Sequence, residues 1–376
     1  MRGTVFKRKG RQTWSVGVEL ERGADGKRKR EWHHGYRTRK DAERALTELM
    51  GRIDRSEHVS PSKQTVERFL VGEWLPGIKT TVRPSTFAVY QAIANGHVLP
   101  YLGERSLQQL KPADLATLYA QLTERGLGAK TVRNVHSLIR SALKEAVTLG
   151  YVTRNVGSLA KPPRVPQTEM RTWNADELRS FLEQMSDDRY YPAWLLLVTT
   201  GMRRGEVLGL HWRDLSLDHS RLSVRQALVL VGNEPTLQEP KTTKGRRSIP
   251  LPPETVAALR AHKAAQLQEK LALGPDYADS DLVFRREDGS LVHPSSLSRR
   301  FGKMVRQTEL PEIRLHDLRH TFATLALQAN VPVKVVSEIL GHASVTITYD
   351  TYSHVIPGMA EDATSKVAAL VFDRAT

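Results

Sequence analysis

The chain has 376 residues, with 56 Lys+Arg against 41 Asp+Glu and no cysteine, so its formal net charge is +15. At roughly 100–200 residues per domain, this length predicts two or three domains. The lack of cysteine excludes disulfides, cysteine-ligated zinc, iron–sulfur clusters and thiol nucleophiles. No apolar run approaches the ~18 residues of a membrane span, and the first ten residues lack a signal-peptide core. We therefore expect a cytoplasmic protein without a membrane partner.

The positive charge indicates a polyanionic partner, because a protein that neutralises phosphates releases their condensed counterions. Residues 1–60 contain 16 Lys+Arg and 9 Asp+Glu, so about half of the excess lies in the first sixth of the chain. The alternative is a basic protein that is charged only for solubility. The uneven distribution favours nucleic acid.

Residues 13–20 alternate apolar and polar side chains, a turn signal follows at 23–26, and a second strand is predicted near 29–36. Thr38 precedes Asp41 as an N-cap would, and an apolar stripe from Ala42 to Ile53 predicts a helix. We expect residues 1–56 to form a small three-stranded sheet plus one helix. Its candidate DNA contacts, which solvated surface charge would also explain, are Arg28, Lys29, Arg30, Arg37 and Arg39.

Residues 63–156 are predicted to form a helical bundle, with helices near 65–75, 85–97, 112–126 and 129–149. A linker is predicted over 157–170, where Lys161–Pro166 is rich in proline. The last domain, 171–376, opens with a capping box from Asn174 to Glu177. It is expected to be mostly helical, with a small antiparallel β-sheet over 222–250 around a turn at 232–235. The fold class is therefore multidomain α+β.

The segment around His316 is the most informative part of the sequence. At 100° per residue, His316, Arg319 and His320 share one helical face, while the apolar residues of the segment share the other. Two histidines and an arginine on one face predict an anion site. Ordinary solvated charge is the first alternative. A histidine metal pair at i, i+4 is the second, although the nearby carboxylate, Asp317, faces elsewhere.

Two further segments carry candidate residues. Thr200-Gly-Met-Arg-Arg-Gly-Glu206 places Arg203 at the start of a helix, where Glu206 can orient its guanidinium. Leu340-Gly-His342 is a turn that leads into Asp350-Thr-Tyr-Ser-His354. Each tyrosine of this stretch, Tyr349 and Tyr352, would in isolation be read as a packing residue.

Taken together, these boxes resemble the tyrosine recombinases of the phage-integrase type. Arg203 stands in T-G-x-R-R-G-E, His316 and Arg319 in H-x-L-R-H, His342 in L-G-H, and Tyr352 in D-T-Y-S-H. The boxes follow one another over residues 203–354 in the family's order. The resemblance extends to residues 63–156 as a core-site-binding domain and, by pattern and charge, to the N-terminal block as the arm-type DNA-binding domain of bipartite integrases.

The resemblance implies a site-specific DNA recombinase that needs no cofactor, metal or ATP. Tyr352 would form a covalent 3′-phosphotyrosine, with Tyr349 as the less favoured alternative. Arg203 and Arg319 would hold the negative charge of the five-coordinate phosphorane, because a guanidinium grips two oxygens at once. His342 would donate to a nonbridging oxygen, and His316 would accept or share the proton of the nucleophile.

A general acid must protonate the leaving 5′-oxygen, and in the family it is a hairpin lysine. Lys241 fits that pattern better than Lys244, because it directly precedes a threonine. Glu206 and His320 are expected to support the site, and no metal is expected.

The resemblance also implies partners: double-stranded DNA with core and arm-type attachment sites, a homotetramer on DNA, and a host bending factor or excisionase. The apolar stretch Val367–Phe372 in the tail 361–376 would dock on a neighbouring protomer or on its own domain. An accessory DNA-binding protein would have lost the tyrosine or an arginine, and neither is lost. A type IB topoisomerase needs no two-site binding architecture, and a metal-dependent transposase needs carboxylates where this face has Arg and His.

Overall fold

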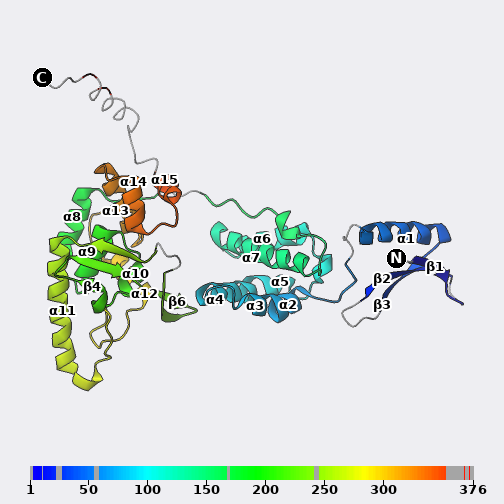
Figure 1. The fold of residues 1–376 in the computed structure, drawn as a ribbon, viewed down its shortest axis with the longest axis horizontal. Coiled ribbons are helices and arrows are strands. Elements are labelled where there is room, and N and C mark those ends of the chain that lie inside the picture. The colour runs from blue at the N-terminus through cyan, green and yellow to red at the C-terminus, as the bar shows by residue number, and fades with distance from the viewer. Residues whose placement is uncertain are drawn as a thin grey trace. The chain divides into compact units, whose positions relative to one another are not determined.

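The computed structural model describes residues 3–10, 12–22, 28–54, 59–166, 170–240 and 245–352, together with Ala368 and Phe372. The chain divides into two compact units, Met1–Pro166 and Gln167–Thr376, and Figure 1 labels most of their helices and several of their strands. In the described part of the chain, no helix combines the length and the hydropathy that crossing a membrane requires. Small antiparallel sheets accompany a mostly helical chain, which confirms the predicted α+β class.

The N-terminal sheet has the strand order β1-β2-β3, and all its pairs are antiparallel. Its strands are β1 (Gly3–Lys7), β2 (Trp14–Arg22) and β3 (Arg28–Tyr36), and the helix α1 (Arg39–Asp54) follows. The predicted cap is confirmed, because the Asp41 amide donates to Thr38 Oγ1 at 3.1 Å. Val16, Val18 and Ala42 form a small core between sheet and helix. The predicted turn at 23–26 lies outside the described residues.

The bundle that follows has a separate core, to which seven buried residues of one helix face contribute. Its helical segments are α2 (Val66–Phe69), η1 (Leu70–Trp74), α3 (Leu75–Ile78), α4 (Pro84–Ile93), η2 (Ala94–Val98), α5 (Leu99–Leu102), η3 (Leu107–Gln109), α6 (Pro112–Glu124), α7 (Ala129–Thr148) and η4 (Val156–Ser158). The four predicted helices are all present, and the first two run longer than predicted.

These two helices each contain one π-helical turn, η1 and η2, directly before a proline-containing segment. Pro76 and Pro100 have no N–H to donate to the carbonyl four residues earlier, and a proline ring also crowds that carbonyl. A wider turn relieves this crowding, so the helix continues through the proline. The apolar periodicity alone did not predict these turns.

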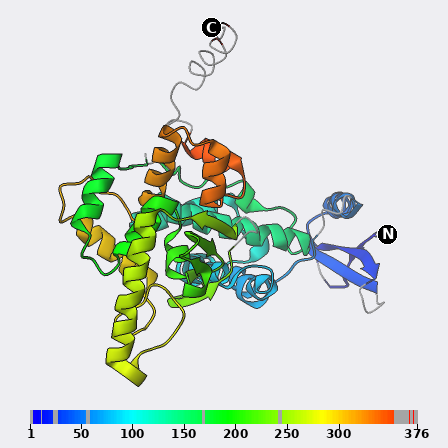
Figure 2. The ribbon, with the colours of Figure 1, turned by 60° about the vertical axis from the view of Figure 1, so that its left-hand side comes forward.

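The C-terminal unit begins with the predicted capping box, in which the Glu177 amide donates to Asn174 Oδ1 at 2.9 Å. Its helices are α8 (Ala175–Gln184), α9 (Tyr191–Thr200), α10 (Arg204–Leu208), η5 (Trp212–Asp214), α11 (Pro253–Leu273), η7 (Gly274–Asp276), α12 (Pro294–Val305), α13 (Asp317–Gln328), α14 (Val333–Leu340) and α15 (Val345–Tyr352). In Figures 1 and 2, α13, α14 and α15 gather at one end of the unit, and α11 runs along its side.

The predicted β-rich stretch forms two separate sheets rather than one hairpin. Its strands are β4 (Leu215–Ser216), β5 (Arg221–Val224), β6 (Ala227–Val231), β7 (Glu234–Gln238) and β8 (Arg247–Pro250). The strands β4, β5 and β8 pair in that order. The strands β6 and β7 form a separate hairpin with a two-residue turn, in which Gly232 has φ +64°. The chain between β7 and β8 therefore connects one sheet to the other.

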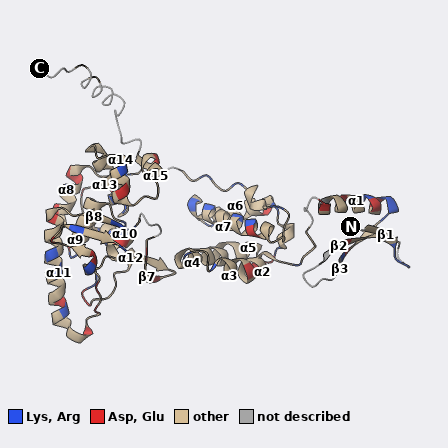
Figure 3. Cartoon of the chain, in the orientation of Figure 1, with Lys and Arg blue, Asp and Glu red and all other residues tan. Residues whose placement is uncertain are grey.

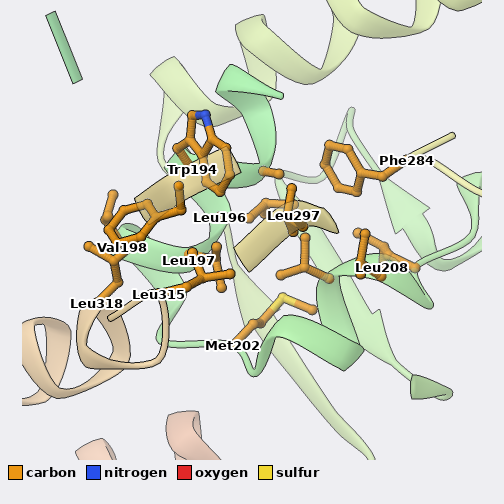
Figure 4. Packing of buried hydrophobic residues seen from close by; sticks show 14 of the residues in the cluster. Trp194, Leu196, Leu197, Val198, Met202, Leu208, Phe284, Leu297, Leu315 and Leu318 are labelled. Atoms are coloured by element: carbon orange, nitrogen blue, oxygen red, sulfur yellow. The ribbon is translucent and has the colours of Figure 1, made fainter. Parts of the chain in front are cut away.

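The helix α9 is the centre of the large core of this unit. Nearly all its residues are buried, among them Trp194, Leu196 and Leu197. Figure 4 shows Leu318, near the start of α13, and Leu315, two residues before that helix, beside Val198 of α9. The apolar side of the His316 segment therefore packs as predicted, and this packing holds the start of α13 next to the end of α9.

Candidate active site

A tight turn at the end of α9 places the first arginine of the site. Gly201 ends the helix with φ +61°, a conformation that strongly favours glycine. A Cβ on Gly201 would approach Phe322 and Leu340 to 2.6 Å. The chain then reaches Arg203, the N-cap of α10, whose side chain remains partly exposed.

Glu206 is a buried carboxylate held by two arginines. It accepts from the Arg203 amide at 2.9 Å and from Arg203 Nη1 at 2.8 Å. Its other partner is Arg247 at the start of β8, which donates to both carboxylate oxygens at 3.2 and 2.8 Å. Burial acts to raise the pKa of Glu206, but the hydrogen bond and charge of Arg247, with the charge of Arg203, outweigh burial and lower it. Glu206 therefore stays ionised and fixes both guanidinium groups.

Arg319 lies on α13 and is 3% exposed. Its Nη1 donates to the Gly201 carbonyl at 2.7 Å, and its Nη2 donates to the Leu340 carbonyl at 2.8 Å. These acceptors are neutral, so they orient the guanidinium without compensating its charge. Burial lowers the pKa of Arg319 to about 9, and the charge of Arg203 acts in the same direction. The site therefore concentrates positive charge, which favours a bound anion.

Tyr352 ends α15 and is 2% exposed, packed in a cluster with residues of α13 and α14. Its hydroxyl lies 2.7 Å from Nδ1 of His320, within hydrogen-bond distance. Burial raises the pKa of the Tyr352 phenol to about 12, although the charge of Arg319 acts to lower it. Burial, together with the charge of His316, lowers the pKa of His320 to about 4. Both groups are therefore neutral near pH 7.

His316 is the N-cap residue of α13, one residue before the helix begins. Its ring meets that of His320 edge to face, with the ring centroids 5.2 Å apart. Although the side chain is partly exposed, burial and the charge of Arg319 lower the pKa of His316. The predicted proton acceptor thus contacts His320, whereas His320 contacts the phenol.

A second glycine turn places His342. Gly341 ends α14 with φ +68°, and a Cβ there would approach Arg247 Nη1 to 2.8 Å. His342 Nδ1 lies 2.8 Å from Thr348 Oγ1 on α15, which fixes the ring. Burial, together with the charges of Arg319 and Arg203, lowers the pKa of His342 to about 4. The positive charges of Arg319 and Arg203 therefore both act on the His342 ring.

Not every predicted residue can be assigned to this site. Lys241 and Lys244 fall in the segment 241–244, outside the described residues, as does most of the tail 361–376. Tyr349 lies on α15 and is 45% exposed, away from the buried cluster that contains Tyr352. No group of three or more His, Asp or Glu side chains in the described part of the chain is arranged to hold a metal ion.

The N-terminal candidates lie on β3 and near α1. Arg30 pairs with Glu19 across the sheet at 2.6 Å, and Arg39 pairs with Glu43 along the helix at 2.9 Å. Arg37 is exposed, and the side chains of Arg28 and Lys29 lie outside the described residues. Basic and acidic residues alternate along α1, as Figure 3 shows.

Sequence reasoning missed Arg247 and Thr348. Arg247 lies 41 residues from Glu206, and no periodicity connects them. A buried carboxylate next to a single partly exposed arginine requires another cation, but the burial of Glu206 was itself not visible in the sequence. Thr348 lies in a hydroxyl-rich helix where several residues could equally have bonded His342, so its role had no sequence signal.

The mostly helical fold and the grouping of a tyrosine with arginines and histidines fit the class of enzyme that the sequence resemblance implied. The chain belongs to the phage integrase family, whose model matches residues 170–358. Residues 68–122 match the phage integrase N-terminal SAM-like domain, and residues 5–53 match an Arm DNA-binding domain. The protein is a tyrosine recombinase, which confirms the predicted family and class of enzyme.

Two curated relatives align with nearly the whole chain. The chain is 29% identical to the tyrosine recombinase XerC-like protein of Caldanaerobacter subterraneus, over 94% of this chain and 95% of that protein. It is 24% identical to the ICEBs1 integrase of Bacillus subtilis, over 89% and 91% of the two chains.

Two solved structures show the same fold. The Tn1549 transposon integrase in complex with transposon right end DNA has a TM-score of 0.68 and 22% identity, covering 81% of this chain and all of that one. A lambda integrase dimer bound to a COC′ core site has a TM-score of 0.58 and 17% identity, covering 92% and 93%.

Proposed function

We propose that this protein cleaves and rejoins double-stranded DNA at specific sites to integrate or excise a mobile element, with Tyr352 as the nucleophile. The observation that carries the proposal is the placement of a buried phenol beside His320 in a site whose arginine charge is only partly balanced. The relatives include an integrase named for the prophage phiRv2 and a transposase from transposon Tn916, which supports a mobile element as the substrate. The proposed place of action is the bacterial cytoplasm, where that DNA lies.

The arginines would bind the scissile phosphate. Arg203 and Arg319 approach from the starts of two different helices, and each is held from behind by acceptors other than the phosphate. Preorganised guanidinium groups need no rearrangement when charge develops on the phosphorane, so they stabilise the transition state. His342, held by Thr348, would donate to a nonbridging oxygen, and His316 would line the same anion site.

Attack by the Tyr352 oxygen would form a 3′-phosphotyrosine and expel the 5′-oxygen, which Lys241 would protonate to a 5′-hydroxyl. The covalent bond stores the energy of the broken phosphodiester, so rejoining would need neither ATP nor a metal. Two rounds of exchange through a Holliday junction would complete recombination within a homotetramer. A lambda integrase tetramer bound to a Holliday junction has the same fold as this chain.

Each part of the chain has a proposed role in binding DNA. Residues 63–156 would bind the core site, and residues 1–56 would read arm sites through the sheet, with Arg28, Lys29, Arg30, Arg37 and Arg39 as candidate contacts. The linker over 157–170 would connect them to the catalytic domain 171–376, whose tail would dock on a neighbouring protomer or in cis. A host bending factor or an excisionase would assist.

Deleting residues 1–55 should weaken arm-site binding and spare cleavage of core DNA.

Covalent capture tests the proposal. The protein is incubated in EDTA with genomic DNA from its source, the reaction is stopped with SDS, and the DNA attached to the protein is sequenced. We expect attachment at a small set of recurrent sites, and loss of the adduct in Tyr352→Phe with DNA binding unchanged. Tyr349→Phe is the matched control, because Tyr349 lies on the same helix and is exposed. Attachment that persists in Tyr352→Phe, or that needs Mg²⁺, contradicts the proposal.

A further inference from the structure

The residue that touches the proposed nucleophile is His320, for which the sequence predicted only a supporting role. Its Nδ1 lies 2.7 Å from the Tyr352 hydroxyl, and the two ring centroids are 5.7 Å apart. His320 lies on α13 and Tyr352 on α15, so tertiary packing makes this contact. It joins two titratable side chains inside a buried cluster.

The phenol cannot act as a nucleophile without losing its proton. Its surroundings in the cluster are apolar, with Leu327, Val336 and Leu340 among its neighbours. Such surroundings disfavour a free phenolate, so the proton must pass to a group already in contact with the oxygen. Among the described residues, the hydrogen-bonding group at that oxygen is His320 Nδ1.

His320 can accept this proton in its resting state. Burial and the charge of His316 hold its pKa near 4, so the ring is neutral at pH 7 and one nitrogen is free to accept. The charged groups around the ring are Asp317, Arg319 and Arg314, and Asp317 favours the protonated form. Asp317 is itself held ionised, because the hydrogen bonds from Arg314 outweigh burial and lower its pKa.

We propose that His320 receives the proton of Tyr352 during strand cleavage and returns it during rejoining, an inference that rests on the proposed function. The O–H bond of the phenol breaks as its proton moves to Nδ1, and the phenol oxygen forms the new bond to phosphorus. The bond from phosphorus to the 5′-oxygen breaks, and that oxygen takes its electron pair and a proton from the general acid. In rejoining, the 5′-hydroxyl returns its proton to the general acid and attacks phosphorus. The bond from phosphorus to the Tyr352 oxygen breaks, and the imidazolium of His320 protonates that oxygen.

The experiment measures the single-turnover rate of adduct formation on a nicked suicide substrate made from a site found by covalent capture. His320→Ala removes the acceptor, and His320→Asn keeps an oxygen near the position of Nδ1 that accepts a hydrogen bond but takes no proton. We expect both variants to slow adduct formation by about 10²-fold or more. The DNA concentration at half-saturation should not change. Added imidazole should restore the rate of His320→Ala at least partly, with more basic imidazoles restoring more.

Other outcomes overturn the inference. A near-normal rate in His320→Asn means that His320 only positions the phenol. If His316→Asn is equally slow and the parallel variant His316→Ala is the one that imidazole rescues, then His316 receives the proton. Thermal unfolding and DNA binding of each variant separate a folding defect from a chemical one. The proposed function fails separately, when the unmodified protein forms no adduct that depends on Tyr352.

Discussion

The two basic regions of this protein use the same residue type in opposite ways. In the N-terminal sheet and helix, Arg30 and Arg39 are exposed by 57% and 69% and pair with carboxylates at the surface. In the C-terminal unit, the side chains of Arg319 and Arg247 are buried. Arg319 donates to two backbone carbonyls, and Arg247 donates to the carboxylate of Glu206. Surface ion pairs contribute little individually, whereas a buried charge that loses its partner is costly. The first region should tolerate single changes, and the second should not.

The largest expected effect is on Glu206. Glu206→Gln replaces a carboxylate with an amide whose NH₂ group faces donors of Arg203 and Arg247. We expect a loss of about 3–5 kcal/mol in the free energy of unfolding, because a buried charge is left without its partner. Denaturant or thermal unfolding of the full chain measures the change.

Glu43→Gln is the matched control for that substitution. Glu43 pairs with the exposed Arg39 in α1, and its loss should change stability by no more than about 0.5 kcal/mol. Equal effects of the two substitutions would contradict the contrast between the regions.

A second prediction concerns rate rather than stability. Arg319→Lys keeps one positive charge, but an ammonium cannot bond both the Gly201 and Leu340 carbonyls while it also faces a phosphate. The single-turnover rate of adduct formation should fall by about 10²–10³-fold. Arg30→Lys should leave that rate unchanged and slightly weaken arm-site binding. A rate for Arg319→Lys within a factor of about ten of the unmodified protein, well short of that loss, would show that a fixed guanidinium is unnecessary.

The smallest expected effect is a pH dependence that belongs to the catalytic unit. The pKa of His320 and of His342 is about 4 in the folded chain, below the ~6.5 of an unfolded histidine. Between these values the unfolded chain takes up protons that the folded chain does not. Stability is therefore complete above about pH 6.5 and decreases as the pH falls toward 4.

The unfolding temperature of the full chain should accordingly fall by a few degrees between pH 7 and pH 5. His342→Gln should flatten that decrease, since its side chain does not titrate in this range. Parallel curves for the two proteins would show that His342 does not carry the effect.

Much of the local structure was predictable because it depends on neighbours in the chain. The cap at Thr38, the capping box at Asn174 and the apolar face of α7 each follow from residues three or four positions apart. The boxes around Arg203, His316, His342 and Tyr352 were visible for the same reason. The β-rich stretch was less predictable, since alternation identifies strands but not their partners.

The amino-acid sequence by itself determined the class of protein, the types of residue in the site and the helices that carry them, because these are written in short-range patterns. The tertiary structure decided which of these residues meet. Arg247 reaches Glu206 across 41 residues, and His320 rather than His316 reaches the phenol of Tyr352 across 32. The packing of α13 and α14 against α9, β8 and α15 brings these partners together. Hydrogen bonds of this kind depend on atomic distances that no spacing in the chain encodes.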